Sequence, residues 1–278
     1  MTMQHDDKKS IDNEQTYKGG ADWKFALLGG LATASARRVY TAAELLSFVR
    51  EFRPTASAST ARVTADMLVS AGALRRVSSG VFLNKRAVPP AEMEEVAQFI
   101  RAGAVISLNS VLGKCGFLNN STDQMVTAVL PSSATKRPKL GELVTSSGDR
   151  FRFLGLAEKF FPKNSQDRFD MLQPGSQCET FRPEAALLQW LHLAGLDRSR
   201  VTLPPVDVDM AALDHQLLGE LAERWDLVAA LRDWQTNAES VNFGEEREAG
   251  GLTQPPSDEA IERGADARRR LMSRKTPQ

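Results

Sequence analysis

Basic and hydroxyl-bearing residues gather in a short stretch of the chain between residues 59 and 86. The basic side chains are Arg62, Arg75, Arg76, Lys85 and Arg86, and the hydroxyl groups belong to Ser59, Thr60 and Thr64. Lysine and arginine neutralise phosphates, whereas arginine and hydroxyl side chains on a helix can reach base edges in the major groove of DNA. These residue types predict a surface that binds nucleic acid.

The charge of the chain is unevenly distributed. The whole sequence holds 35 basic and 35 acidic residues, so its net charge is zero. Residues 22–90 contain ten Lys/Arg and four Asp/Glu, a net charge of +6. Residues 205–278 contain nine and fifteen, a net charge of −6. This asymmetry indicates partners of different charge for the two parts.

Three helices are expected to position the basic group. The first lies in DWKFALLGGLATA, residues 22–34. The second begins after Thr41, which forms a capping box with Glu44, and it ends before Pro54. The third lies in SASTARVTADMLVSAG, residues 57–72, with Ser57 or Ser59 as N-cap and a glycine as its end.

A hairpin is predicted directly after the third helix. The runs LRRV and VFLN flank the turn SSG within residues 74–84. An isolated hairpin is marginally stable in water, so it must pack against the helices. Three helices followed by such a hairpin are typical of a winged helix-turn-helix over residues 22–88. An ordinary surface hairpin with solvated arginines is the alternative.

The rest of the chain predicts a mixed α/β domain over residues 89–235. A helix in PPAEMEEVAQFIRAG is followed by the strand-like runs AVISL, MVTAVL and RFRFLGL. FRPEAALLQWLHLAGL reads as an amphipathic helix with one apolar stripe, and two further helices are expected between residues 205 and 234. The expected fold class is therefore α+β, between a disordered lead-in at 1–21 and a disordered tail at 236–278.

The sequence offers little support for catalysis or for a bound cofactor. It lacks the phosphate-binding, dinucleotide-binding, zinc-protease and serine-hydrolase motifs. Its two cysteines, Cys115 and Cys178, show neither metal-ligand spacing nor a disulfide framework. No apolar run is long enough to cross a bilayer, and the polar N-terminus does not look like a signal peptide. We expect a cytoplasmic protein with no catalytic residues, metal site or cofactor.

Several short motifs occur in an order that resembles the AbiEi-like antitoxins of type IV toxin–antitoxin systems. MLVSAGALRRVSSGVFLN resembles the end of the winged helix of that family, and AVISLNSVLGKCGF resembles its next segment. MVTAVLP and RFRFLGL are similar to its following strands, and RPEAALLQWLHLAGL is similar to its late helix. The resemblance spans about residues 23–235. Phe82 replaces a usual tyrosine, and Gln189 replaces a usual acidic residue.

The resemblance implies an antitoxin of an abortive-infection system that also represses its own operon. The winged helix would bind double-stranded promoter DNA, and the remainder would antagonise a nucleotidyltransferase-like toxin. Acidic helices at residues 207–234 suit direct contact with a basic toxin surface, but they would equally suit a solvated face. Two other functions remain open: a stand-alone winged-helix regulator whose second domain binds a ligand or dimerises, and a nucleic-acid-processing enzyme.

Overall fold

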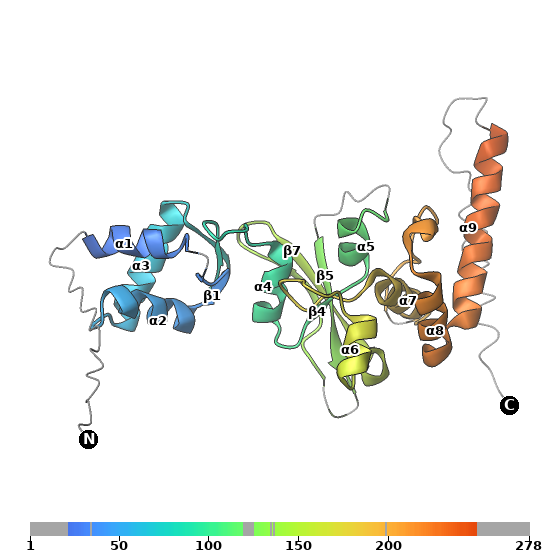
Figure 1. Ribbon diagram of the computed structural model, residues 1–278, viewed down its shortest axis with the longest axis horizontal. Coiled ribbons are helices and arrows are strands. Elements are labelled where there is room, and N and C mark those ends of the chain that lie inside the picture. Colours follow the sequence, from blue (N-terminus) through green and yellow to red (C-terminus); the bar gives the residue numbers. More distant parts are fainter. Residues whose placement is uncertain are drawn as a thin grey trace, which may run out of the picture. The chain divides into compact units, whose positions relative to one another are not determined.

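The computed structural model describes residues 22–33, 35–118, 125–133, 135, 137–197 and 199–248 (Figure 1). Side chains are described as far as Ala238. Its fold class is α+β, as predicted. The chain divides into two compact units, residues 1–91 and 92–278. The division falls three residues after the boundary at residue 88 that the sequence predicts. The predicted lead-in at 1–21 lies outside the described residues.

The described residues of the first unit form three helices and a three-stranded sheet. Its elements are α1 (Asp22–Gly30), β1 (Val39–Thr41), α2 (Ala42–Phe52), α3 (Ala58–Ser70), β2 (Leu74–Ser78) and β3 (Val81–Asn84). The sheet order is β1-β3-β2, and both pairings are antiparallel. This arrangement is that of a winged helix, with β2 and β3 as the wing.

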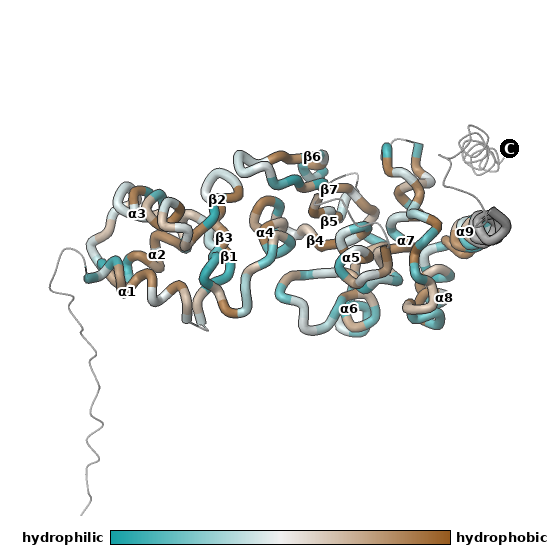
Figure 2. The backbone as a smooth tube through the Cα atoms, turned by 90° about the horizontal axis from the view of Figure 1, so that it is seen from above, coloured by the Kyte–Doolittle hydropathy of each residue, from teal (hydrophilic) through white to brown (hydrophobic). Residues whose placement is uncertain are grey.

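Local sequence signals fix the ends of these elements. Thr41 and Glu44 form the predicted capping box at the start of α2. Ser57, one of the two predicted N-caps, accepts a hydrogen bond from the backbone N–H of Thr60. Gly72 follows α3 with a φ of 69°, a conformation that favours glycine. Apolar residues are prominent along α2 in Figure 2, and its buried residues join a core with α1 and α3.

The strand β1 was not predicted. It has only three residues, too few for an alternating pattern, and it pairs with Val81–Leu83 far along the chain. Asn84 anchors the same region. Its side chain is 0% exposed and its amide nitrogen donates to the carbonyl oxygens of Leu31 and Arg37, at 2.8 and 2.9 Å. The loop before β1 is thereby tied to the end of β3.

The second unit is built around a mixed sheet. Its elements are α4 (Met93–Ile100), β4 (Val105–Ile106), α5 (Asn109–Lys114), β5 (Met125–Ser132), β6 (Gly141–Val144), β7 (Arg150–Ala157), α6 (Ser165–Met171), α7 (Pro183–Ala194), α8 (His215–Trp225) and α9 (Val228–Glu248), with short 3₁₀ turns at 158–160 and 210–212. The sheet order is β4-β5-β7-β6. β5 and β7 are parallel, whereas the other two pairs are antiparallel. β6 and α6 were not predicted.

The helix α7 differs from its predicted amphipathic form. Ten of its residues are buried, among them Glu184 and Gln189. It packs against α5, α8 and α9, and α8 and α9 lie beside it in Figure 1. The apolar residues predicted to face the core are all buried, namely Ala186, Leu187, Trp190, Leu191 and Ala194. Burial extends around the helix beyond this stripe, so α7 is an interior helix rather than an amphipathic one.

The C-terminal boundary also differs from the prediction. The sequence places a disordered tail from residue 236, but α9 continues to Glu248. The segment 236–248 contains no proline, and each added residue of a helix contributes a hydrogen bond once the helix has started. The rest of the predicted tail, residues 249–278, lies outside the described residues. None of the helices that the structure describes is long and apolar enough to span a membrane.

Candidate nucleic-acid interface

The helix α3 has one buried face and one exposed face. Ala61, Thr64, Ala65 and Leu68 are buried. The exposed positions Ser59, Arg62, Val63 and Asp66 follow the i, i+3, i+4, i+7 spacing of a single helix face. This exposed face contains Ser59 and Arg62, two of the four residues predicted on the helix.

A cluster of hydroxyl groups occupies the start of α3. The Ser57 Oγ atom lies 2.7 Å from Ser59 Oγ and 3.1 Å from Thr60 Oγ1. Hydroxyl groups both donate and accept hydrogen bonds, so the cluster can rearrange to meet a phosphate or a base edge. Ser59 and Thr60 therefore remain candidate contacts, and Ser57 joins them through its N-cap position.

Thr64 does not belong to the interface that the sequence predicted. Its side chain is only 4% exposed, and its hydroxyl group donates to the Thr60 carbonyl oxygen at 2.8 Å. Threonine commonly bonds the carbonyl one turn back, which satisfies a hydroxyl group turned away from solvent. The prediction that Thr64 contacts DNA is therefore wrong.

Arg75 and Arg76 lie on opposite faces of the sheet. They are neighbours on β2, where Arg75 pairs with Leu83 and Arg76 with Phe82, and successive strand residues alternate in direction. Arg76 contacts α3: its guanidinium donates to Asp66 Oδ1 at 2.5 Å and lies 5.2 Å from the Phe82 ring centre. Only Arg76 of the pair is thus placed on the α3 side of the wing.

A groove runs between α2, α3 and the turn of the wing. Its lining includes Arg62 and Arg76 together with Ser79 and Gly80 of the turn. The remaining lining is formed by small or apolar residues of both helices and by Phe82. The groove brings together two basic residues that are distant in sequence, and it places backbone of the turn beside them. The turn itself, Ser78–Gly80, carries no charge.

Lys85 and Arg86 are exposed just after β3. Their backbone N–H groups donate to the Ala73 carbonyl oxygen and to the Asn84 side-chain oxygen, both at 3.0 Å. These bonds fix the backbone while the side chains point to solvent. Within the part of the chain that the structure describes, the side chains of Arg62, Lys85 and Arg86 have no ion-pair or hydrogen-bond partner.

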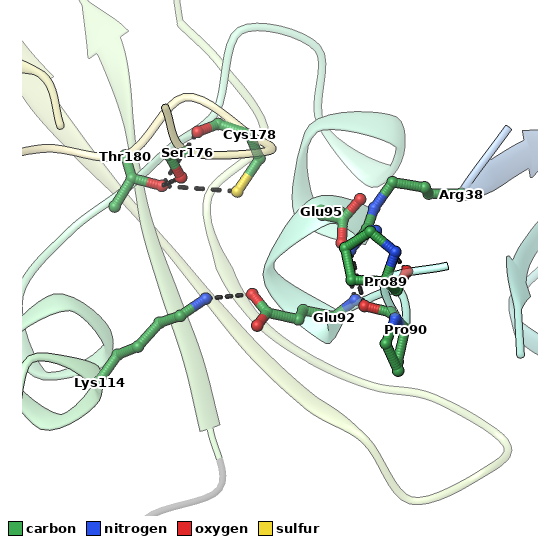
Figure 3. Close-up of polar contacts among 9 residues, drawn as sticks. All are labelled: Arg38, Pro89, Pro90, Glu92, Glu95, Lys114, Ser176, Cys178 and Thr180. Carbon is green, nitrogen blue, oxygen red and sulfur yellow. Dashed lines mark hydrogen bonds and ion pairs between the residues drawn. The ribbon is translucent and has the colours of Figure 1, made fainter. Parts of the chain in front are cut away.

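Other cations of the first unit serve the fold. Arg37 forms an ion pair with Glu44 at 2.9 Å. Arg38 donates to the carbonyl oxygens of Pro89 and Pro90, at 2.5 and 2.7 Å (Figure 3). Arg50 donates to the Ala56 carbonyl oxygen. Arg53 lies over the Trp23 ring. These arginine side chains are therefore held by contacts within the unit, so fewer than the ten basic side chains are free to contact a partner.

Polar motif residues of the second unit are buried in its fold. The Ser107 hydroxyl group donates to Gln189 Oε1 at 2.5 Å, and Gln189 Nε2 donates to the Phe160 carbonyl oxygen at 3.3 Å. Ser107 and Gln189 are both 0% exposed. Position 189, where the resembled family carries an acid, thus joins three segments of the chain through neutral hydrogen bonds.

The surroundings of both cysteines of the second unit raise the pKa of the thiol group. Burial raises the pKa of the Cys115 thiol, and the nearby carboxylate of Glu184 raises it further. Burial also raises the pKa of Cys178, although a hydrogen bond with Thr180 opposes that shift. Figure 3 shows Cys178 beside Ser176 and Thr180, and shows Lys114 paired with Glu92. Among the described residues, no three histidine, cysteine or acidic side chains gather to hold a metal ion.

Comparisons with known proteins add little to these observations. No family model matches the chain. No curated protein matches it either. The chain is similar to a solved structure, that of the RV2827C protein from Mycobacterium tuberculosis, with 18% identity over 77% of each chain and a TM-score of 0.46. No function is inferred from a likeness of this degree.

Proposed function

We propose that residues 22–91 bind duplex DNA and that the chain is the antitoxin and autorepressor of a type IV toxin–antitoxin operon. The observation that carries the DNA proposal is the exposed face of α3. Arg62 lies there without a partner among the described residues, beside a groove that also contains Arg76 and the turn of the wing. Such a helix with an adjacent wing suits the major groove and the flanking backbone.

Each basic residue has a distinct role in this proposal. Arg62, in the N-terminal half of α3, donates to a guanine edge in the major groove. Lys85 and Arg86 neutralise phosphates and so position the unit without reading sequence. Arg76 reaches a phosphate only by exchanging its bond with Asp66, because that carboxylate holds its guanidinium in the free protein.

The antitoxin half of the proposal rests on the order of the motifs. The segment that contains Ser107 and the helix that contains Gln189 are far apart in sequence, yet they share a buried hydrogen bond. The two segments that resemble the antitoxin family thus pack in one core, as expected if they belong to the same domain. The partner would be a nucleotidyltransferase-like toxin, and promoter binding would place the chain in the cytoplasm.

DNA binding is tested with the full chain and the DNA upstream of its own gene. We expect Arg62→Ala to weaken binding by about 30-fold, the order of a lost bidentate base contact. Arg168→Ala is the matched control, because Arg168 is an exposed arginine of the second unit that is paired with Glu179. Fluorescence anisotropy measures both. Equal affinities for the two variants would contradict the assignment of α3.

Antitoxin activity is tested by growth rescue. A nucleotidyltransferase-like gene adjoining this one is expressed with the full chain or with its Arg62→Ala variant. We expect both to restore growth, and only the unaltered chain to repress a reporter that carries the promoter. Repression without rescue would favour a stand-alone winged-helix regulator instead.

A further inference from the structure

A large apolar side chain lies exposed on the face of α3 that carries Ser59 and Arg62. Val63 is 69% exposed, although the helix offers a buried face for apolar residues. It directly follows Arg62 and lies one turn from Ser59, so polar groups border it on the exposed face. Valine is also a poorer helix former than alanine, so helix formation alone does not account for it.

The major groove of DNA offers one apolar group that such a side chain can contact. The 5-methyl group of thymine projects into this groove, and apolar side chains read it by burying it. Val63 lies in the N-terminal half of α3, the half of a reading helix that reaches base edges. On a helix that enters the major groove by that half, the two methyl groups of Val63 would face the base edges.

We infer that Val63 is a specificity-determining residue that reads a thymine 5-methyl group in the operator. This inference rests on the proposed DNA binding and extends it from a charge-driven contact to a base preference. Arg62 selects a guanine, and Val63 selects a thymine close to it. We therefore expect the operator to contain a guanine and a thymine close enough together for α3 to contact both.

The chemistry around Val63 favours DNA over a second copy of the chain. Arg62, Lys85 and Arg86 leave the first unit with exposed positive charge, which complements phosphate and opposes association of two like surfaces. Val63 is also a single apolar residue among polar neighbours. Stable protein interfaces need roughly 800 Å² of surface per partner, far more than one valine supplies.

The test replaces thymine with deoxyuridine, one position at a time, in the operator. Deoxyuridine lacks only the 5-methyl group, so every hydrogen bond to the base is kept. We expect the full-length chain to bind about four-fold more weakly when one particular thymine of the operator is replaced, the effect of exposing one methyl group. The Val63→Ala variant should bind the thymine and deoxyuridine forms of that position equally well.

A matched variant and a folding check accompany the test. Val144→Ala alters a similarly exposed valine on β6 of the second unit, and it should keep the full response to deoxyuridine. Circular dichroism should show that Val63→Ala folds, because alanine favours a helix more than valine does. Equal sensitivity of the Val63→Ala variant and the unaltered chain would overturn the inference. A complete lack of DNA binding by the unaltered chain would instead refute the proposed function.

Discussion

The helices α3 and α7 use their polar residues in opposite ways. α3 has a buried apolar face and an exposed polar face, so Ser59 and Arg62 are available to a partner. α7 is buried on nearly all sides, so Glu184 and Gln189 bond within the protein. A polar residue on a helix is therefore a candidate contact only when its face of the helix is exposed. Burial, more than residue type, decides which polar side chains of these two helices are free to contact a partner.

The largest effect is expected from breaking the buried contact of α7. Gln189→Ala leaves the Ser107 hydroxyl group and the Phe160 carbonyl oxygen without their partner, and it opens a cavity. Together these changes should lower the free energy of unfolding by about 3 kcal/mol. Chemical denaturation with a spectroscopic readout measures the loss.

The control for this variant is Gln166→Ala. Gln166 is exposed on α6 and donates to Asp170 at 2.8 Å, so its loss should cost less than about 0.5 kcal/mol. DNA affinity of the folded protein should be the same for both variants. A small loss for Gln189→Ala would mean that the buried bonds contribute no more than a surface pair.

A smaller effect is expected at the end of the wing. Replacing Lys85 and Arg86 with alanine should weaken binding to every DNA sequence and lower the salt slope by about two, one for each lost phosphate contact. Arg75→Ala should change the slope little, because Arg75 projects from the other face of the sheet. Binding titrations at several salt concentrations measure the slopes. A larger change for Arg75 would reverse the assignment of the two faces.

Much of the first unit could be predicted because its signals are local. The Thr41–Glu44 capping box, Gly72 and the wing turn lie within a few residues of the ends they define. The strand β1 and the anchor Asn84 depend on contacts across the unit, which no short motif encodes.

The candidate site shows the same limit. Residue type selected Arg62 and Lys85, which are exposed, but it also selected Thr64, which is buried and whose hydroxyl group donates to the carbonyl oxygen one turn back. The bond between Arg76 and Asp66 was missed because it joins a strand to a helix. Helical periodicity could have excluded Thr64, since it shares the buried face with Ala61 and Leu68.

A modest gain of affinity is expected from Asp66→Asn. The Asp66 carboxylate repels phosphates and holds the Arg76 guanidinium, so its neutralisation removes a negative charge and releases a cation. Because the pair is exposed and screened by salt, binding should strengthen only about three-fold. The gain should be equal for specific and unrelated DNA, measured by anisotropy at low salt. A loss confined to the specific operator would assign Asp66 to base reading instead.

The smallest effect concerns acid stability of the first unit. Burial raises the pKa of Glu44, but hydrogen bonds from the Thr41 backbone and hydroxyl group, with the nearby Arg37, outweigh it and leave that pKa below its usual 4.5. The resulting stabilisation is therefore complete above about pH 4.5 and is lost as the pH falls through the lower pKa of the folded state. Glu44→Gln keeps an acceptor for the capping box but not the charge. It should lower stability by a few tenths of a kcal/mol near neutral pH, and this difference should vanish in acid.

Denaturation between pH 7 and pH 3 measures the difference between Glu44→Gln and the unaltered chain. The same measurement on Asp167→Asn gives the comparison for the second unit, where hydrogen bonds from the Lys163 backbone and from Arg224 lower the pKa of Asp167. A Glu44→Gln difference that persisted at pH 3 would show that the charge of Glu44 is not its source.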